Sequence, residues 1–196
     1  MLMKKFWFTL MIPVFLLSCA QNAEEKGQNS AKQDKQKDTD ADIRASTLIE
    51  ADESVPEYSF TTTAGEQYTM EELNGKVVLL NFFATWCPTC MDEMPALQNE
   101  VWEKYKDHEA FMLVSIGREQ DMQKMKEFKS GKGYDWHFAP DTGRVMYSKF
   151  ATKYIPRNVL VDPDGTIAYQ NTGYTEEEFQ ILLERIELEM EKLQPE

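Results

Sequence analysis

Two cysteines separated by two residues, Cys87 and Cys90, constrain this sequence more than any other feature. The residues before them, Val77 to Phe83, form an apolar run interrupted only by Asn81, which is typical of a strand buried on both faces. The residues from Pro88 to Lys106, which include Cys90, carry apolar side chains near a 3.6-residue spacing, and this spacing predicts a helix. The pair therefore lies where a strand meets a helix. Two thiols so spaced can close a small disulfide, and a helix N-terminus stabilises a thiolate.

The N-terminal residues have the pattern of a secretory signal peptide, which we place at residues 1–18. Lys4 and Lys5 form its basic start, and Phe6 to Leu17 form its apolar stretch. This stretch is short for a membrane span and contains Pro13, so a permanent transmembrane anchor is the weaker interpretation.

The end of this signal is more specific. The residues Leu16-Leu17-Ser18-Cys19 resemble the lipobox of bacterial lipoproteins, in which the cysteine becomes the lipid-modified first residue of the mature chain. Several acyl chains at Cys19 would hold the protein stably at a membrane. The alternative is an ordinary cleavage site with a chance cysteine nearby. We expect a bacterial extracytoplasmic protein, in the periplasm or at the cell surface, with a lipid anchor.

Charge and cysteine content narrow the function further. The formal net charge is −13, or about −15 once the two signal lysines are removed, which argues against binding to nucleic acid. Disulfides persist outside the cytoplasm. With Cys19 lipidated, only Cys87 and Cys90 remain, too few for a structural disulfide framework. This favours a catalytic role for the pair.

The sequence predicts a tether followed by one folded domain. Residues 19–54 comprise the lipidated cysteine and a polar segment nearly free of aromatic side chains, which buries too little apolar surface to fold alone. A disordered chain of this length reaches about 30 Å. The folded domain is expected at residues 55–196.

Strand and helix patterns alternate through this domain. The predicted strands are Tyr58–Phe60, Gln67–Thr69, Val77–Phe83, Ala110–Ile116, Trp136–Ala139, Asn158–Val161 and Thr166–Gln170. The predicted helices are Pro88–Lys106, Asp121–Ser130, Val145–Phe150 and a last one that begins after Thr175. This order of elements is typical of a three-layer α/β sandwich.

The stretch F-F-A-T-W-C-P-T-C-M-D-E-M-P-A-L resembles the active-site region of thioredoxin-like proteins. It is most similar to the membrane-anchored TlpA/ResA-like thiol:disulfide oxidoreductases, which include the reductants of cytochrome c maturation. The resemblance covers roughly Val55 to Leu193 and rests on W-C-P-T-C, on the Glu93 and Pro95 that follow, and on Ile155-Pro156. It implies a thioredoxin-like three-layer α/β/α sandwich with a mixed central sheet and an N-terminal β-hairpin extension.

The two cysteines are expected to act in sequence. Cys87, at the helix N-terminus, is the expected attacking thiolate, and Cys90, about one turn inside the helix, the resolving thiol. A metal site would need a second pair of ligands, and His108 and His137 are single and lie in different elements. We therefore expect no metal. The sequence also lacks a nicotinamide or flavin motif, so the cysteine pair itself is the expected redox centre.

Three residues around the cysteines are further candidates. Trp86 is expected to cover the site and contact substrate, although ordinary partial burial would also explain it. Pro88 and Thr89 occupy the dipeptide that tunes the redox potential, and Pro88 suits the first turn of a helix because it lacks an N–H. The resembled group carries this Pro-Thr pair, whereas general cytoplasmic thioredoxins carry Gly-Pro.

Glu93 lies three residues after Cys90 and hence on the same helix face. The resemblance implies that its carboxyl relays a proton to or from Cys90. General thioredoxins instead use an Asp at the strand position that is Asn81 here, and an amide cannot titrate. The alternative is a first-turn carboxylate that simply favours the helix dipole.

Two prolines complete the predicted site. Pro95 is expected to remove one hydrogen bond from the helix and kink it. Pro156 resembles the cis-proline that faces the active site of thioredoxins, where the backbone of Ile155 would pair with an extended substrate peptide. The alternative is a trans proline that opens the next strand.

The sequence thus predicts a lipid-anchored enzyme that reduces disulfides of exported proteins and receives electrons from a membrane thiol carrier. By resemblance, a client is the haem-binding C-x-x-C-H of apocytochrome c or another protein that needs reduced thiols. Three alternatives stay open: a disulfide-donating oxidase, a peroxiredoxin-like peroxidase and a redox-inert peptide-binding module. The peroxidase lacks support because its proline and threonine signature is absent. We expect a monomer, although the sequence leaves the oligomeric state open.

Overall fold

The computed structural model describes residue 35 and residues 37–193. The predicted signal peptide and Cys19 lie outside these residues. The chain divides into two compact units, Met1–Asp42 and Ile43–Glu196, and the described residues of the first unit are helical. In the described part of the chain, no helix is both long enough and apolar enough to cross a membrane.

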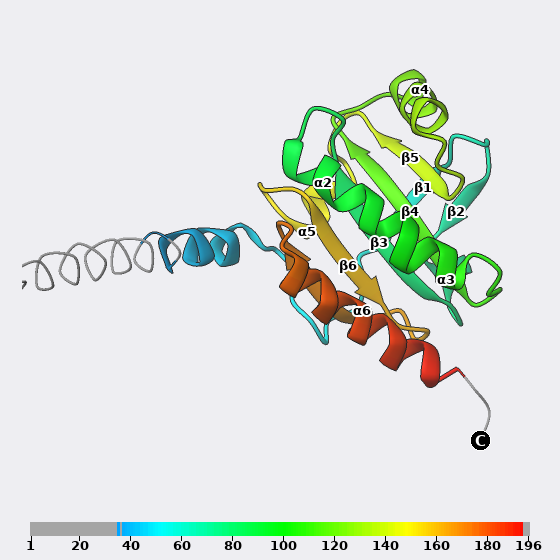
Figure 1. Ribbon diagram of the computed structural model, residues 1–196. Coiled ribbons are helices and arrows are strands. Elements are labelled where there is room, and N and C mark those ends of the chain that lie inside the picture. Colours follow the sequence, from blue (N-terminus) through cyan, green and yellow to red (C-terminus); the bar gives the residue numbers. More distant parts are fainter. Residues whose placement is uncertain (1–34, 36, 194–196) are drawn as a thin grey trace, which may run out of the picture. The chain divides into compact units, whose positions relative to one another are not determined.

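The second unit is built on a five-stranded mixed sheet with the order β5-β4-β3-β6-β7 (Figure 1). Its strands are β3 (Val77–Phe83), β4 (Phe111–Arg118), β5 (His137–Asp141), β6 (Arg157–Val161) and β7 (Ile167–Thr172). β3, β4 and β5 run parallel, whereas β6 and β7 pair antiparallel. A separate two-stranded sheet, β1 (Ser59–Thr61) with β2 (Gln67–Thr69), is the predicted N-terminal hairpin.

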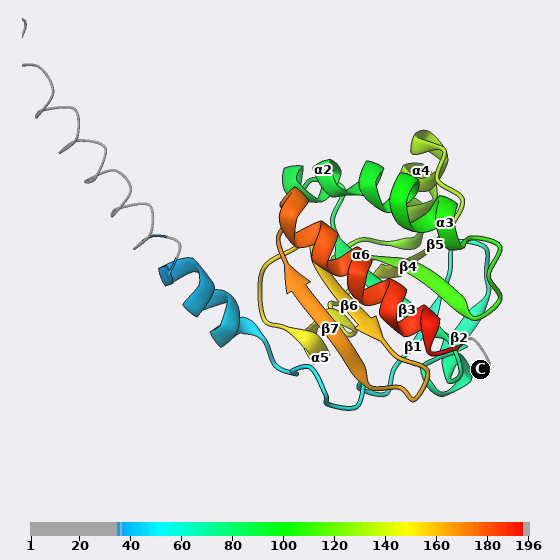
Figure 2. The ribbon, with the colours of Figure 1, turned by 60° about the horizontal axis from the view of Figure 1, so that its bottom comes forward.

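Helices cover one face of this sheet, and shorter elements cover the other. On the first face lie α2 (Pro88–Ala96), α4 (Met122–Lys132) and α6 (Glu176–Glu191), and α2 and α6 are seen over this face in both ribbon views (Figures 1 and 2). The second face packs against the hairpin, η1 (Glu71–Leu73) and α5 (Tyr147–Phe150). The predicted thioredoxin-like α/β/α sandwich is confirmed.

Successive side chains of β3 point to opposite faces of the sheet and pack into the two halves of the core. Leu79 belongs to the cluster under α2 and α6, and Leu80 belongs to the cluster on the opposite face. Every residue of β3 is buried, because β4 and β6 flank the strand and both of its faces are covered. Each buried apolar side chain of this size contributes about 1.5–3 kcal/mol. The residues that follow β3 are therefore attached to the central, fully buried strand of the sheet.

The helix predicted from Pro88 to Lys106 contains a change of helix type. Pro95 lies inside α2, where it has no N–H to donate to the preceding turn. The chain then continues as a π-helical segment, η2 (Leu97–Trp102), and as α3 (Glu103–Tyr105). The irregularity begins two residues after the proline, close to where the kink is predicted.

The predicted start of the domain at residue 55 is wrong. Residues 46–55, here called the strap, are hydrogen-bonded to the domain through their backbone. Leu48 N–H donates to the Phe150 carbonyl at 2.9 Å, and Asp52 N–H donates to the Ile167 carbonyl at 2.9 Å. The Ile49 carbonyl also accepts from Gln170 Nε2 at 2.5 Å. The folded unit therefore begins at Ile43, because backbone pairing holds a segment predicted from the sequence to belong to the disordered tether.

We expect removal of the strap to destabilise the domain. A chain that starts at residue 56 loses several backbone hydrogen bonds that a chain starting at residue 43 keeps, and each contributes about 1 kcal/mol net. The expected loss is about 2–4 kcal/mol in the free energy of unfolding, measured by urea denaturation of both chains. Equal stabilities would show that the strap is only loosely attached.

Candidate active site

The two cysteines form a disulfide at the N-terminus of α2. Cys87 is the N-cap residue, and its Sγ accepts the backbone N–H of Cys90 at 3.2 Å. Their Cα atoms are 5.3 Å apart. Cys87 keeps 6% of its surface exposed, whereas Cys90 keeps 0%. Attack by Cys87 and resolution by Cys90 require this difference in exposure, because only the outer sulfur has to meet a partner protein.

A glutamine from another strand end holds the turn before the cysteines. The side-chain oxygen of Gln120 accepts the Thr85 backbone N–H at 3.1 Å, and its Nε2 donates to Thr85 Oγ1 at 2.7 Å. Gln120 is buried and lies two residues beyond the end of β4. Sequence reasoning missed this residue, because its partner is 35 positions away and no local pattern marks the pair.

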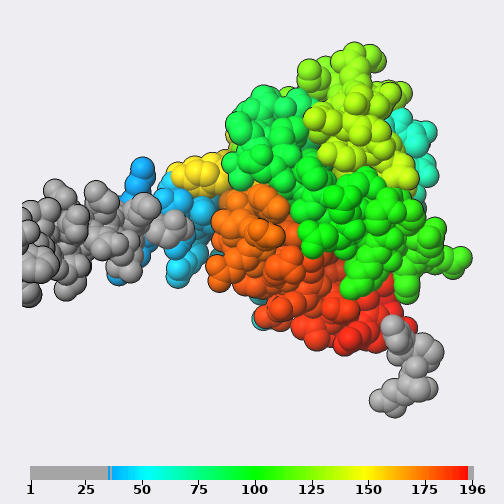
Figure 3. Space-filling view, viewed as in Figure 1, coloured from blue at the N-terminus to red at the C-terminus, as the bar shows by residue number. Residues whose placement is uncertain are grey.

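The predicted cis-proline is confirmed, since the peptide bond between Ile155 and Pro156 is cis. The carbonyl oxygen of Ile155 lies 3.8 Å from Cys87 Sγ, so the two predicted residues are neighbours of the disulfide. Tyr147 braces this loop, because its hydroxyl donates to the Tyr154 carbonyl. In the space-filling view, the yellow loop lies beside the green start of α2 and the orange residues that precede α6 (Figure 3).

Trp86 is exposed rather than partly buried, with 62% of its surface accessible. Its ring centroid lies 5.7 Å from the guanidinium carbon of Arg118, a separation at which a cation attracts an aromatic face. Pro88 occupies the first turn of α2, and Pro88 and Thr89 are both exposed. An indole ring and this dipeptide are thus available at the surface around Cys87, as contact with a partner protein requires.

Glu93 is fully buried, so it is not a surface carboxylate stabilised only by the helix dipole. Its Oε2 accepts from Asn81 Nδ2 at 2.8 Å, and its Oε1 accepts from Asn158 Nδ2 at 2.6 Å. Burial raises the pKa of Glu93 to about 7, and the two amide hydrogen bonds oppose this rise. A carboxyl group with such a pKa gains and loses protons near neutral pH, as a proton relay requires.

Asn158 is a second residue that sequence reasoning did not single out. It lies directly opposite Asn81 in the antiparallel pairing of β3 and β6. The available signal was a polar residue within a predicted buried strand, at the position where the neighbouring strand also carries an asparagine. Only the strand register shows that both amides converge on Glu93.

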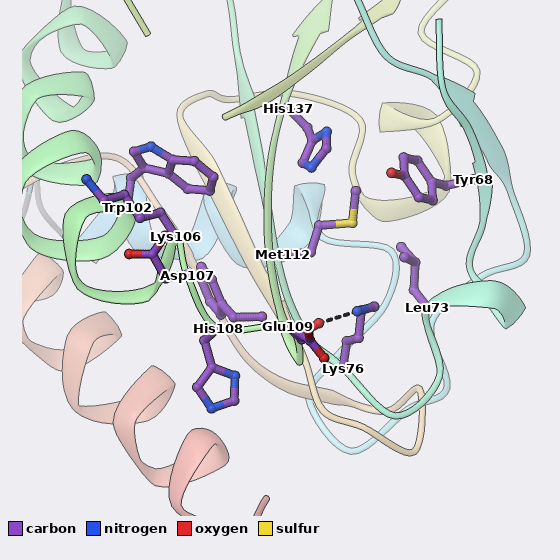
Figure 4. A pocket seen from close by; sticks show the side chains of 11 residues that line it. Tyr68, Leu73, Lys76, Trp102, Lys106, Asp107, His108, Glu109, Met112 and His137 are labelled. Atoms are coloured by element: carbon purple, nitrogen blue, oxygen red, sulfur yellow. Dashed lines mark hydrogen bonds between the residues drawn. The ribbon is translucent and has the colours of Figure 1, made fainter. Parts of the chain in front are cut away.

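A separate pocket of about 280 Å³ lies at the opposite ends of β3 and β4 (Figure 4). Figure 4 shows Trp102 and Lys106 on one side of it and Tyr68 and Leu73 on the other. The seven residues of β3 span about 20 Å between the pocket and the strand end that leads to the cysteines. Neither cysteine lines the pocket. It is therefore not part of the thiol site. The described residues contain no group of three His, Cys, Asp or Glu side chains placed to hold a metal.

A disulfide that caps a helix opposite a cis-proline loop, on this mixed sheet, places the chain in a known class. It is a thioredoxin-like thiol-disulfide oxidoreductase. The Redoxin family model matches residues 50–186, and the chain belongs to this family as a TlpA/ResA-type thioredoxin-like protein.

Relatives and solved structures agree with this assignment. The chain is 31% identical over 132 residues to "Thiol-disulfide oxidoreductase ResA" of Bacillus thuringiensis (strain Al Hakam), covering 67% of this chain and 75% of the relative. It is 36% identical over 126 residues to "Thioredoxin-like protein YneN" of Bacillus subtilis (strain 168), covering 64% and 73%. A solution structure of a putative protein disulfide isomerase from Bacteroides thetaiotaomicron has 34% identity and a TM-score of 0.71, covering 74% of this chain and 93% of the other.

Proposed function

We propose that this protein is an exported, lipid-anchored enzyme that reduces disulfides of extracytoplasmic proteins. The observation that carries the proposal is the position of Cys87: it is the less deeply buried member of the pair, and its sulfur lies 3.8 Å from the Ile155 carbonyl oxygen. A client peptide that pairs with the backbone of Ile155 would bring its own disulfide to this sulfur. Trp86, Ile155 and Pro156 are the proposed substrate contacts.

The reaction transfers two electrons from the protein to its client. In the reduced enzyme, the Cys87 thiolate attacks one client sulfur, forms a mixed disulfide and releases the other client sulfur as a thiolate, which takes a proton from water. Cys90 loses its proton to the Glu93 carboxylate and attacks Cys87. The mixed disulfide then breaks, the second client thiol leaves, and Cys87 and Cys90 are joined as in the structure. Pro88 and Thr89 are the residues proposed to set the potential of this exchange.

The partners follow from the proposed location. Clients are proteins with accessible disulfides, and the haem-binding C-x-x-C-H of apocytochrome c is one candidate. A membrane thiol carrier would restore the reduced enzyme, so no cofactor beyond the cysteine pair is needed. The lipid anchor at Cys19 would keep a monomeric enzyme near that carrier. Mass spectrometry of the membrane fraction tests the anchor, and an unmodified, soluble mature chain would contradict it.

The direction of electron flow is tested by the reduction potential. We expect a value of about −200 mV or lower, in the range of cellular disulfide reductants. A value near about −120 mV, as for strong periplasmic oxidants, would instead make the protein a disulfide donor. Trapping with Cys90→Ser, followed by identification of proteins disulfide-linked to Cys87, then names the clients. The double variant Cys87→Ser/Cys90→Ser is the matched control and should capture nothing.

A further inference from the structure

A row of three polar side chains crosses the sheet beneath α2. Asn158 on β6, Asn81 on β3 and Ser115 on β4 occupy directly paired positions. All three have 0% of their surface exposed. Leu79, Leu113 and Leu160 lie two positions away from these residues on the same strands, and hence on the same face of the sheet. They belong to the apolar cluster under α2 and α6, so the row points into that cluster. Polar groups in such a place are stable only when their hydrogen bonds are satisfied.

The hydrogen bonds of the row all run towards Glu93. Trp136 Nε1 donates to Ser115 Oγ at 2.9 Å, and Ser115 Oγ donates to Asn81 Oδ1 at 3.2 Å. Asn81 Nδ2 then donates to Glu93 Oε2 at 2.8 Å and to Asn158 Oδ1 at 2.9 Å. Asn158 Nδ2 completes the set by donating to Glu93 Oε1 at 2.6 Å. Both carboxylate oxygens therefore face N–H groups.

The donor-to-acceptor direction of this series of hydrogen bonds is set by Trp136, at the end that is farther from Glu93. The indole N–H of Trp136 is only a donor, so Ser115 Oγ has to accept from it. The serine hydrogen is then left to donate to Asn81, which turns the Asn81 carbonyl towards β4 and its NH₂ towards Glu93. The two ends of a primary amide have nearly the same shape, so packing alone does not distinguish them. The hydrogen bond from Ser115 to Asn81 Oδ1 does, together with the one that Asn81 Nδ2 donates to Asn158 Oδ1.

We propose that Ser115 and Trp136 are positioning residues that orient the Asn81 amide and thereby keep Glu93 able to ionise in the core. The proposal deepens, and rests on, the proton relay proposed for Glu93. If Asn81 turned over, its carbonyl oxygen would face Glu93 Oε2. Only a protonated carboxyl could then donate a hydrogen bond there, and the proton would be held too tightly for transfer.

The other groups around Glu93 do not replace this arrangement. Its pKa reflects burial and the two asparagine amides. On the same helix, Cys90 is joined to Cys87 in the disulfide, and Asp92 is exposed. Tyr174, which precedes α6, has a raised pKa owing mainly to burial and partly to nearby negative charges, of which those of Glu176 and Glu100 exceed that of Glu93. The amides thus supply the stabilisation that a cation supplies in an ion pair.

The test is Ser115→Ala in the full chain, with the pKa of Glu93 followed by carbon-13 NMR of labelled glutamate carboxyl groups. We expect the Glu93 pKa to rise by about one unit from its value of about 7, because the Asn81 amide then loses one of the hydrogen bonds that fix its orientation. Disulfide reduction at pH 7 should slow several-fold and recover at higher pH. Ser115→Thr keeps the hydroxyl and should restore both values, which a purely structural role would not predict.

A second variant covers the case in which Ser115→Ala does not fold. Trp136→Phe removes the donor and frees the serine hydroxyl to turn, so the Glu93 pKa should rise by a smaller amount. An unchanged Glu93 pKa in a folded variant would overturn the positioning role, whatever the exchange rate. A raised pKa with an unchanged exchange rate would support the positioning role and instead contradict the relay. The two proposals can therefore fail separately.

Discussion

Replacing Cys87 with serine is expected to abolish disulfide reduction, with insulin as the substrate and dithiothreitol as the electron source. Cys87 is the less deeply buried cysteine, caps α2 and accepts the Cys90 N–H at its sulfur, so it has both the access and the electrostatic support of an attacking thiolate. A serine hydroxyl at the same place is far less acidic and cannot form the mixed disulfide. The rate of insulin precipitation should fall to that of dithiothreitol alone.

Cys90→Ser is the matched control for this prediction. It leaves the first attack intact but removes the thiol that resolves the mixed disulfide. We therefore expect this variant to accumulate a covalent adduct with the substrate, which a non-reducing gel will show, whereas Cys87→Ser forms none. Activity retained by Cys87→Ser would mean that the fully buried Cys90 reaches substrate, and the proposed order of the two cysteines would be wrong.

Replacing Glu93 with glutamine is expected to slow resolution of the mixed disulfide by about 10²-fold at pH 7. The wild-type rate should rise through about pH 7, where the Glu93 carboxylate forms and can accept the Cys90 proton. Glutamine cannot accept that proton. The rate of the variant should therefore lack the rise through about pH 7. Stopped-flow measurements between pH 5 and pH 9 will separate the two profiles.

The same variant has an independent signature in stability. The pKa of Glu93 is raised by folding, from 4.5 to about 7, so the folded state binds the proton more tightly. The resulting stabilisation is complete below about pH 4.5 and is lost as the pH rises through about 7. Between pH 4 and pH 8, wild type should lose about 3 kcal/mol relative to Glu93→Gln. Urea unfolding curves that shift in parallel for both proteins would show that Glu93 has an ordinary pKa.

Local pattern accounts for most of the fold that could be predicted. The uninterrupted apolar run at Val77–Phe83 and the 3.6-residue spacing after Pro88 reflect burial, which selects side chains residue by residue. The hairpin around Ala64-Gly65 also has a local signal, because its turn chemistry lies in adjacent residues. Each of these elements is present where the sequence predicts it.

The strap shows where local pattern fails. Most of it belongs to a longer segment, residues 19–54, whose mostly polar composition predicts disorder. The backbone N–H and C=O groups of the strap nevertheless pair with Phe150 and Ile167, more than 100 positions further along the chain. Backbone groups are the same in every residue except proline, so such pairing leaves no mark in the sequence. Gln120 escaped prediction for a related reason, since its partner Thr85 is distant in the chain.

The sequence by itself determined the chemistry of this protein. It predicts a strand that leads to two cysteines, a helix that begins on them, and a cis-proline motif. These features could be predicted because thiol reactivity and helix starts depend on residues close in the chain. Only the tertiary structure decided that Glu93 is buried and that Asn81, Asn158 and Ser115 meet beneath it. Those contacts depend on strand register and on how deeply α2 packs, which are properties of the whole folded domain.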